Sequence, residues 1–116
     1  MKIAVIVQTD PSKYQDFETA YEVVTAALNK GHEVKVFLYD ESVVAASKDL
    51  ETIGKKGAGE MMKELIERGV EVTTCSACCL FRGIAKEMLV EGSQMGGLPD
   101  LAKMTSWADR ILNFSH

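Results

Sequence analysis

All three cysteines of this 116-residue chain lie in one five-residue segment, Cys75-Ser76-Ala77-Cys78-Cys79. A cysteine thiolate is a nucleophile, a redox group and a metal ligand, so three cysteines this close together predict chemistry at the segment. The segment follows an apolar run typical of a buried strand and opens a pattern typical of a helix. If a helix starts at Ser76, Cys75 is its N-cap residue, and the free amides of Ala77 and Cys78 lie near its sulfur.

The helix start by itself is a weak activator of Cys75. The charge effect of a helix terminus is worth ~0.3–1 kcal/mol, which is too little to ionise most of a thiol at neutral pH. Arg82 adds positive charge two turns further along, where a helical conformation places it roughly 10 Å away. We therefore expect a structural or solvent-facing role for Arg82.

The spacing of the cysteines leaves several kinds of chemistry open. Cys75 and Cys78 form a C-x-x-C pair, which permits a disulfide across the first helical turn. Cys79, four residues after Cys75 on a helix, lies with its Cβ ~5–6 Å away, beyond the ~3.5–4.5 Å of a relaxed disulfide, so we expect it to be buried packing. A closed metal site usually needs a fourth ligand, which only His32 or His116 would supply. The remaining alternative is that all three thiols simply fill a core-facing turn.

Apolar patterns along the chain predict the elements that position the cysteines. Short apolar runs predict strands at residues 2–8, 34–39, 70–74 and 111–114. Apolar side chains at three- and four-residue spacing predict two amphipathic helices, formed by Phe17, Ala20, Tyr21, Val24, Ala27 and Leu28, and by Ala58, Met61, Met62, Leu65 and Ile66. Gly31 and Gly69 follow these helices, where a left-handed cap is expected.

The alternation of strands and helices predicts an α/β fold. We expect a single domain over residues 1–116, with a parallel or mostly parallel sheet of about five strands and helices on both faces. Reactive groups in such folds gather beyond the carboxyl ends of the strands, and Cys75 falls at such an end.

The intervening segments give weaker patterns. Residues 41–48 are consistent with a short helix, and the glycine-rich residues 54–59 predict a flexible connection. Pro99 is well placed as a first helical residue. In that helix Leu101, Ala102 and Trp107 are expected to face the core.

Composition narrows the classes of function. A formal net charge of −4, with no cluster of basic and aromatic residues, argues against direct binding of nucleic acid. The apolar run at residues 2–8 is too short to span a membrane and is not followed by a signal-peptide cleavage site. An odd, clustered cysteine count does not suit a secreted disulfide framework. We therefore expect a cytoplasmic protein with free thiols.

Several segments together resemble the DsrE/DsrF-like family, which includes the TusD-type sulfur-relay proteins. The resemblance is carried by residues 69–77 (GVEVTTCSA) and 80–84 (LFRGI) around the cysteines. Residues 2–8, 31–34 and 108–114 fit in order and spacing, so the likeness spans nearly the whole chain.

The resemblance implies a small α/β fold that assembles into homo- or hetero-oligomers with related subunits. It also implies that Cys75 accepts sulfane sulfur as a persulfide from a donor protein or small sulfur donor and passes it to an acceptor protein. No cofactor is needed, because sulfur is the cargo. Cys78 and Cys79 are not part of the family's pattern; from the C-x-x-C spacing, Cys78 is a candidate resolving thiol. A thiol–disulfide redox protein using Cys75 and Cys78, and a non-catalytic oligomeric subunit, are the alternatives.

Overall fold

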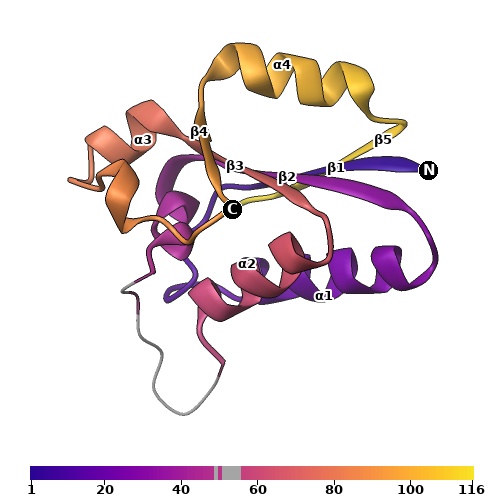
Figure 1. Ribbon diagram of the computed structural model, residues 1–116, viewed down its shortest axis with the longest axis horizontal. Coiled ribbons are helices and arrows are strands. Elements are labelled where there is room, and N and C mark those ends of the chain that lie inside the picture. The colour runs from indigo at the N-terminus through magenta and orange to yellow at the C-terminus, as the bar shows by residue number, and fades with distance from the viewer. Residues whose placement is uncertain (49, 51–55) are drawn as a thin grey trace.

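Strands and helices alternate along the chain, as the apolar patterns predict (Figure 1). The computed structural model describes residues 1–48, 50 and 56–116. Within these residues the strands are β1 (Lys2–Val7), β2 (Glu33–Leu38), β3 (Glu71–Cys75), β4 (Gln94–Gly96) and β5 (Arg110–Phe114). The helices are α1 (Asp16–Asn29), α2 (Ala58–Glu67), α3 (Ser76–Leu80) and α4 (Leu98–Trp107), with 3₁₀ helices η1 (Asp40–Ala46) and η2 (Lys86–Met88).

The five strands form one parallel sheet in the order β4-β3-β2-β1-β5. Figure 1 shows α1 and α2 on one face of the sheet and α4 on the other. Right-handed crossovers explain this arrangement, because β1 to β3 advance in one direction across the sheet, whereas the connection through α4 returns to the far side of β1. The predicted α/β class, parallel sheet and two helical layers are confirmed.

The core lies mainly between the sheet and the pair α1 and α2. These helices bury the apolar stripes predicted for them, including Phe17 and Val24 from α1 and Leu65 from α2. Each helix leads into a glycine with a positive φ, 86° at Gly31 and 93° at Gly69. A side chain is strained in this left-handed conformation, so glycine lets the chain turn sharply from each helix into the next strand.

The weaker patterns were only partly correct. The short helix predicted at residues 41–48 is the 3₁₀ helix η1. Of the connection predicted at residues 54–59, residues 54 and 55 lie outside the described part of the chain, and Ala58 and Gly59 already belong to the first turn of α2. Strand β4 was not predicted, because three residues with a glycine carry too little apolar pattern.

The prediction for α4 was wrong at Ala102, which is exposed, whereas Met104 is buried in the core. Leu101 and Met104 are three residues apart and share the inner face of the helix, so Ala102 points away from it. Pro99 is the second residue of α4 rather than the first. Trp107 is half-buried, and the ammonium of Lys35 lies 4.5 Å from its ring centroid. None of the described helices is long and apolar enough to cross a membrane.

Thr74, the residue before Cys75, gives a prediction about stability. Its side chain is fully buried, and its Oγ1 has no hydrogen-bond partner among the described residues. Because an unpaired buried hydroxyl costs ~1–3 kcal/mol, Thr74→Val is expected to raise the free energy of unfolding by about 1 kcal/mol. Urea unfolding of the two proteins measures the difference, and a loss of stability would show that the hydroxyl has a partner in solution.

Candidate functional site

Three neighbouring strands end at the same edge of the sheet, and the cysteines lie there. Because β1, β2 and β3 are parallel and adjacent, the residues that follow them, Gln8, Tyr39 and the α3 cysteines, meet at this edge. In Figure 1 this edge carries η1 and α3, at the left of the view.

Cys75 is the N-cap residue of α3, as the sequence predicts, and it is also the last residue of β3, one residue beyond the predicted end of the strand. The expected contact between its sulfur and the first amides of the helix is absent, since the Cys75 side chain makes no capping hydrogen bond. Its relative exposure is only 7%, and it packs in the hydrophobic core. The Cys75 thiol is therefore surrounded by side chains of the core and does not cap the helix.

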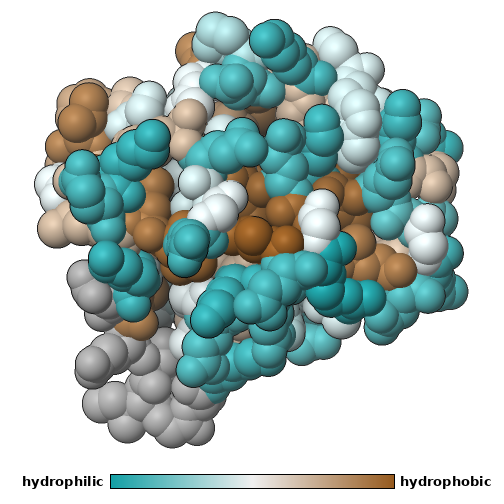
Figure 2. Space-filling model, viewed as in Figure 1, coloured by the Kyte–Doolittle hydropathy of each residue, from teal (hydrophilic) through white to brown (hydrophobic). Residues whose placement is uncertain are grey.

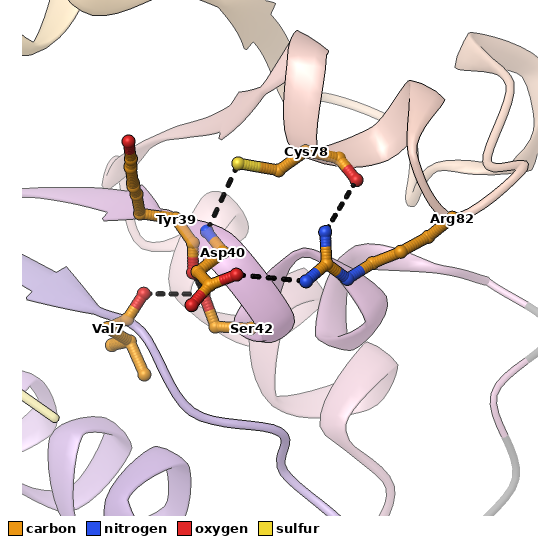
Figure 3. A network of polar contacts seen from close by, with 6 residues as sticks. All are labelled: Val7, Tyr39, Asp40, Ser42, Cys78 and Arg82. Atoms are coloured by element: carbon orange, nitrogen blue, oxygen red, sulfur yellow. Dashed lines mark hydrogen bonds and ion pairs between the residues drawn. The ribbon is translucent and has the colours of Figure 1, made fainter. Parts of the chain in front are cut away.

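Cys78 faces an open cavity. Its side chain is half-buried, and the cavity has a volume of about 660 Å³. The cavity is lined by Gln8, Tyr39, Asp40, Cys78, Phe81 and Arg82. The main-chain N–H of Asp40 donates a hydrogen bond to the Cys78 Sγ over 3.2 Å (Figure 3). Of the three thiols, Cys78 is the most accessible to a molecule in the cavity.

Asp40 and Arg82 connect the end of β2 to α3 around Cys78. The Arg82 guanidinium lies 2.9 Å from the Asp40 carboxylate and donates to the Cys78 carbonyl oxygen over 3.0 Å (Figure 3). Asp40, whose N–H donates to the sulfur, has a φ of 55°, which is uncommon for a residue other than glycine. Of the structural or solvent-facing role expected for Arg82, these contacts agree with the structural one, and its partners were not predicted.

Asp40 is the residue of this site that the sequence analysis missed. It comes two residues after the end of β2, a strand that the sequence does predict. In a parallel sheet, residues just beyond neighbouring strands lie at one edge, so this position was a usable signal.

The environment of each thiol affects its acidity. Burial and hydrogen bonding with the Cys75 side chain raise the pKa of Cys78, while the Asp40 amide and the positive charge of Arg82 oppose the rise. Burial raises the pKa of Cys79 to about 11. Cys79 is fully buried, which confirms the prediction that it is a packing residue.

The acidity of Cys79 predicts a loss of stability at alkaline pH. With a folded pKa of about 11, the folded protein keeps this proton where an unfolded thiol of pKa ~8.5 has lost it. Stability therefore falls between about pH 8.5 and 11, by up to ~1.4 kcal/mol per pH unit from this group. Urea unfolding across this range should give a shallower pH dependence for Cys79→Ala than for the unmodified chain, and parallel curves would contradict the assignment.

Comparison with known proteins shows the family to which the chain belongs. Residues 1–114 match the DsrE/DsrF-like family. The chain belongs to this family. An uncharacterized protein of Methanocaldococcus jannaschii is 31% identical over 114 residues, covering 98% of this chain and all of that protein. The Sulfurtransferase TusD homolog of Vibrio vulnificus is 29% identical and covers 86% of this chain and 87% of its own length.

The DsrE/DsrF-like fold is also seen in a solved structure. The crystal structure of the ychN protein from E. coli superposes with a TM-score of 0.90 at 23% identity, covering 98% of this chain and 99% of that one. At this level of identity the likeness supports the fold, which agrees with the five-stranded parallel sheet described above.

The histidines considered as metal ligands have other partners in this DsrE-family chain. His32 contacts the N-terminal amine of Met1 over 2.7 Å, and His116 lies 3.1 Å from Asp16. Among the residues that the structure describes, no group of three or more His, Cys, Asp or Glu side chains is arranged to hold a metal ion.

The surface beside the cavity is apolar. Leu80 and Phe81, at the end of α3, are 75% and 87% exposed. Figure 2 shows apolar surface over this region, at the left of the view. Phe81 also lines the cavity that contains Cys78.

Proposed function

We propose that this chain is an intracellular sulfur-relay protein in which Cys75 carries sulfane sulfur as a persulfide. The observation that carries the proposal is the position of Cys75, at the carboxyl end of β3 and next to a second thiol that faces an open cavity. The similarity to a protein named Sulfurtransferase TusD homolog supports the same chemistry. The donor is a persulfide, on a protein or a small molecule, and the acceptor is a partner protein in the cytoplasm. Homo- or hetero-oligomers with related subunits are part of the proposal.

The transfer is a nucleophilic substitution at sulfur. The Cys75 thiolate attacks the outer sulfur of a donor persulfide, so a new S–S bond forms at Cys75 as the donor thiolate leaves. An acceptor thiolate then attacks the outer sulfur of Cys75-S-SH and regenerates the Cys75 thiolate. Each step exchanges one S–S bond for another, so no oxidant, reductant or cofactor is consumed.

Cys78 is proposed as the resolving thiol. Attack of its thiolate on the inner sulfur of Cys75-S-SH gives a Cys75–Cys78 disulfide and releases hydrogen sulfide. Cys75 is the N-cap residue of α3 and Cys78 lies in its first turn, so the C-x-x-C pair is close in space. Sulfide release per loaded protein should be lost in Cys78→Ser; unchanged release would remove this role.

Intact-protein mass spectrometry after incubation with a small-molecule persulfide, followed by removal of the donor, tests the function. We expect a gain of one sulfur atom that a reductant removes and that peptide mapping assigns to Cys75. A loss of two hydrogens that requires both Cys75 and Cys78, with no added sulfur, would instead support the thiol–disulfide redox alternative. If the protein neither gains sulfur nor loses two hydrogens, the result would support a non-catalytic subunit.

A further inference from the structure

The two proposed reactive thiols differ in their access to a donor. Cys75 is only 7% exposed and packs in the core, whereas Cys78 is half-buried and lines the cavity of about 660 Å³. Substitution at sulfur requires the attacking thiolate to reach the outer sulfur of the donor, so access limits the rate. A donor in the cavity meets the Cys78 sulfur before that of Cys75.

We propose that Cys78 is the entry thiol of the relay, held in position by Asp40 and Arg82, and that it passes the sulfur on to the buried Cys75. This inference rests on the proposed function, since it describes how Cys75 is loaded. Cys78 thereby has a role in accepting sulfur as well as the proposed role in releasing it.

The contacts around Cys78 fit this role. Burial raises the pKa of Cys78, and the Asp40 N–H, which donates to the Cys78 Sγ, opposes that rise by stabilising the thiolate that must attack the donor. The ion pair with Arg82 anchors Asp40, and the bond from Arg82 to the Cys78 carbonyl anchors α3. Asp40 and Arg82 are therefore positioning residues, because they hold the Cys78 sulfur in place and do not react themselves.

The steps balance without a further reactant. In the first step the Cys78 thiolate attacks the outer sulfur of the donor R-S-SH, forming Cys78-S-SH and releasing R-S⁻. In the second, the Cys75 sulfur attacks the outer sulfur of Cys78-S-SH, forming Cys75-S-SH, and the proton of the Cys75 thiol passes to the departing Cys78 sulfur. One S–S bond breaks as one forms in each step, so there is no net oxidation.

The Asp40 amide serves both steps. It stabilises the negative charge on the Cys78 sulfur when that sulfur attacks the donor and again when it leaves as Cys75 takes the cargo. The nearby charge of Arg82 acts in the same direction. Transfer from the cavity to the enclosed thiol therefore begins and ends at a Cys78 sulfur that these two groups stabilise as a thiolate.

Time-resolved loading by glutathione persulfide tests the proposal. Samples are quenched with an alkylating reagent, and sulfur on Cys75 and on Cys78 is quantified by peptide mass spectrometry. In the unmodified chain, sulfur should occur first on Cys78 and later on Cys75. In Cys78→Ala, loading of Cys75 should be slower by about tenfold or more. Cys79→Ala is the matched control, and it should load like the unmodified chain.

The outcomes separate the two proposals. If Cys75 gains sulfur equally fast with and without Cys78, the entry role is wrong and the carrier role stands. If Cys75 gains no sulfur even in the unmodified chain, the carrier role itself fails. Thermal melting of each variant establishes that it is folded before its loading is measured.

The pH dependence of Cys78 alkylation tests the positioning role of Arg82. In Arg82→Gln, alkylation of Cys78 should shift to higher pH, because the variant loses both the guanidinium charge and the anchor of Asp40. Arg82→Lys should restore part of the shift, since it keeps the charge. An unchanged pH profile in Arg82→Gln would overturn the positioning role.

Discussion

Cys75→Ser is expected to hold at least about tenfold less sulfur than the unmodified chain once the donor has been removed and the protein rinsed with a small thiol. We expect a persulfide on Cys78, which lines an open cavity, to exchange with that thiol, and a persulfide on Cys75, which packs in the core, to exchange far more slowly. The rinse is kept short, so that Cys78 has not yet released the sulfur on Cys75 as hydrogen sulfide. The substitution removes the enclosed position and leaves the exposed one. Intact-protein mass spectrometry after the rinse measures the retained sulfur.

Two controls isolate the role of the Cys75 sulfur. Cys75→Ala should behave like Cys75→Ser, although it lacks the buried hydroxyl that would otherwise seek a hydrogen bond. Cys79→Ala removes a neighbouring buried thiol and should retain sulfur normally. Sulfur retained in both Cys75 variants would move the carrier role to another thiol.

Phe37→Ala is expected to destabilise the fold by ~3–5 kcal/mol, the largest effect on stability that we predict. Phe37 is 1% exposed and lies in β2, the central strand of the sheet. Strand alternation places it on the opposite face from Val36, the side that α4 covers. That layer has a single main helix, so few side chains can move to fill the space that the lost phenyl ring leaves. Urea unfolding gives the change in free energy.

The same substitution at Phe81 provides a matched control. Phe81 is 87% exposed, so Phe81→Ala should change the free energy of unfolding by less than about 0.5 kcal/mol. A comparable loss of stability at both positions would mean that the exposed phenylalanine is covered in solution, as in an assembled oligomer. Unfolding at several protein concentrations distinguishes that case, since an oligomer becomes more stable as its concentration rises.

The three cysteines differ in burial, and the role expected of each follows from its position. Cys79 is fully buried with a pKa of about 11, so it stays protonated at neutral pH and contributes packing. Cys75 is enclosed and Cys78 is accessible, which suits the first to storage and the second to exchange. Three thiols within five residues thus have different surroundings, and we expect their chemistry to differ accordingly.

Much of the architecture could be predicted from the sequence, because it depends on local pattern. Apolar runs gave the positions of β1, β2, β3 and β5 to within about a residue or two, and apolar stripes gave α1 and α2. Their alternation led to the parallel sheet, and so to the placement of Cys75 at a carboxyl edge. Where the pattern was weak, as in β4 and at Ala102, the prediction failed.

The alternation of strands and helices and the cysteine cluster at the end of β3 could be predicted from local sequence patterns alone. Which thiol faces the cavity, and which groups surround it, depends on contacts between distant parts of the chain. Asp40 and Arg82 are 42 residues apart in the chain, and they meet because β2 and β3 are neighbours in the sheet. Apolar periodicity reports whether a side chain turns toward the core. It carries no information about which distant polar groups a fold brings together, because those contacts depend on strand order and loop geometry.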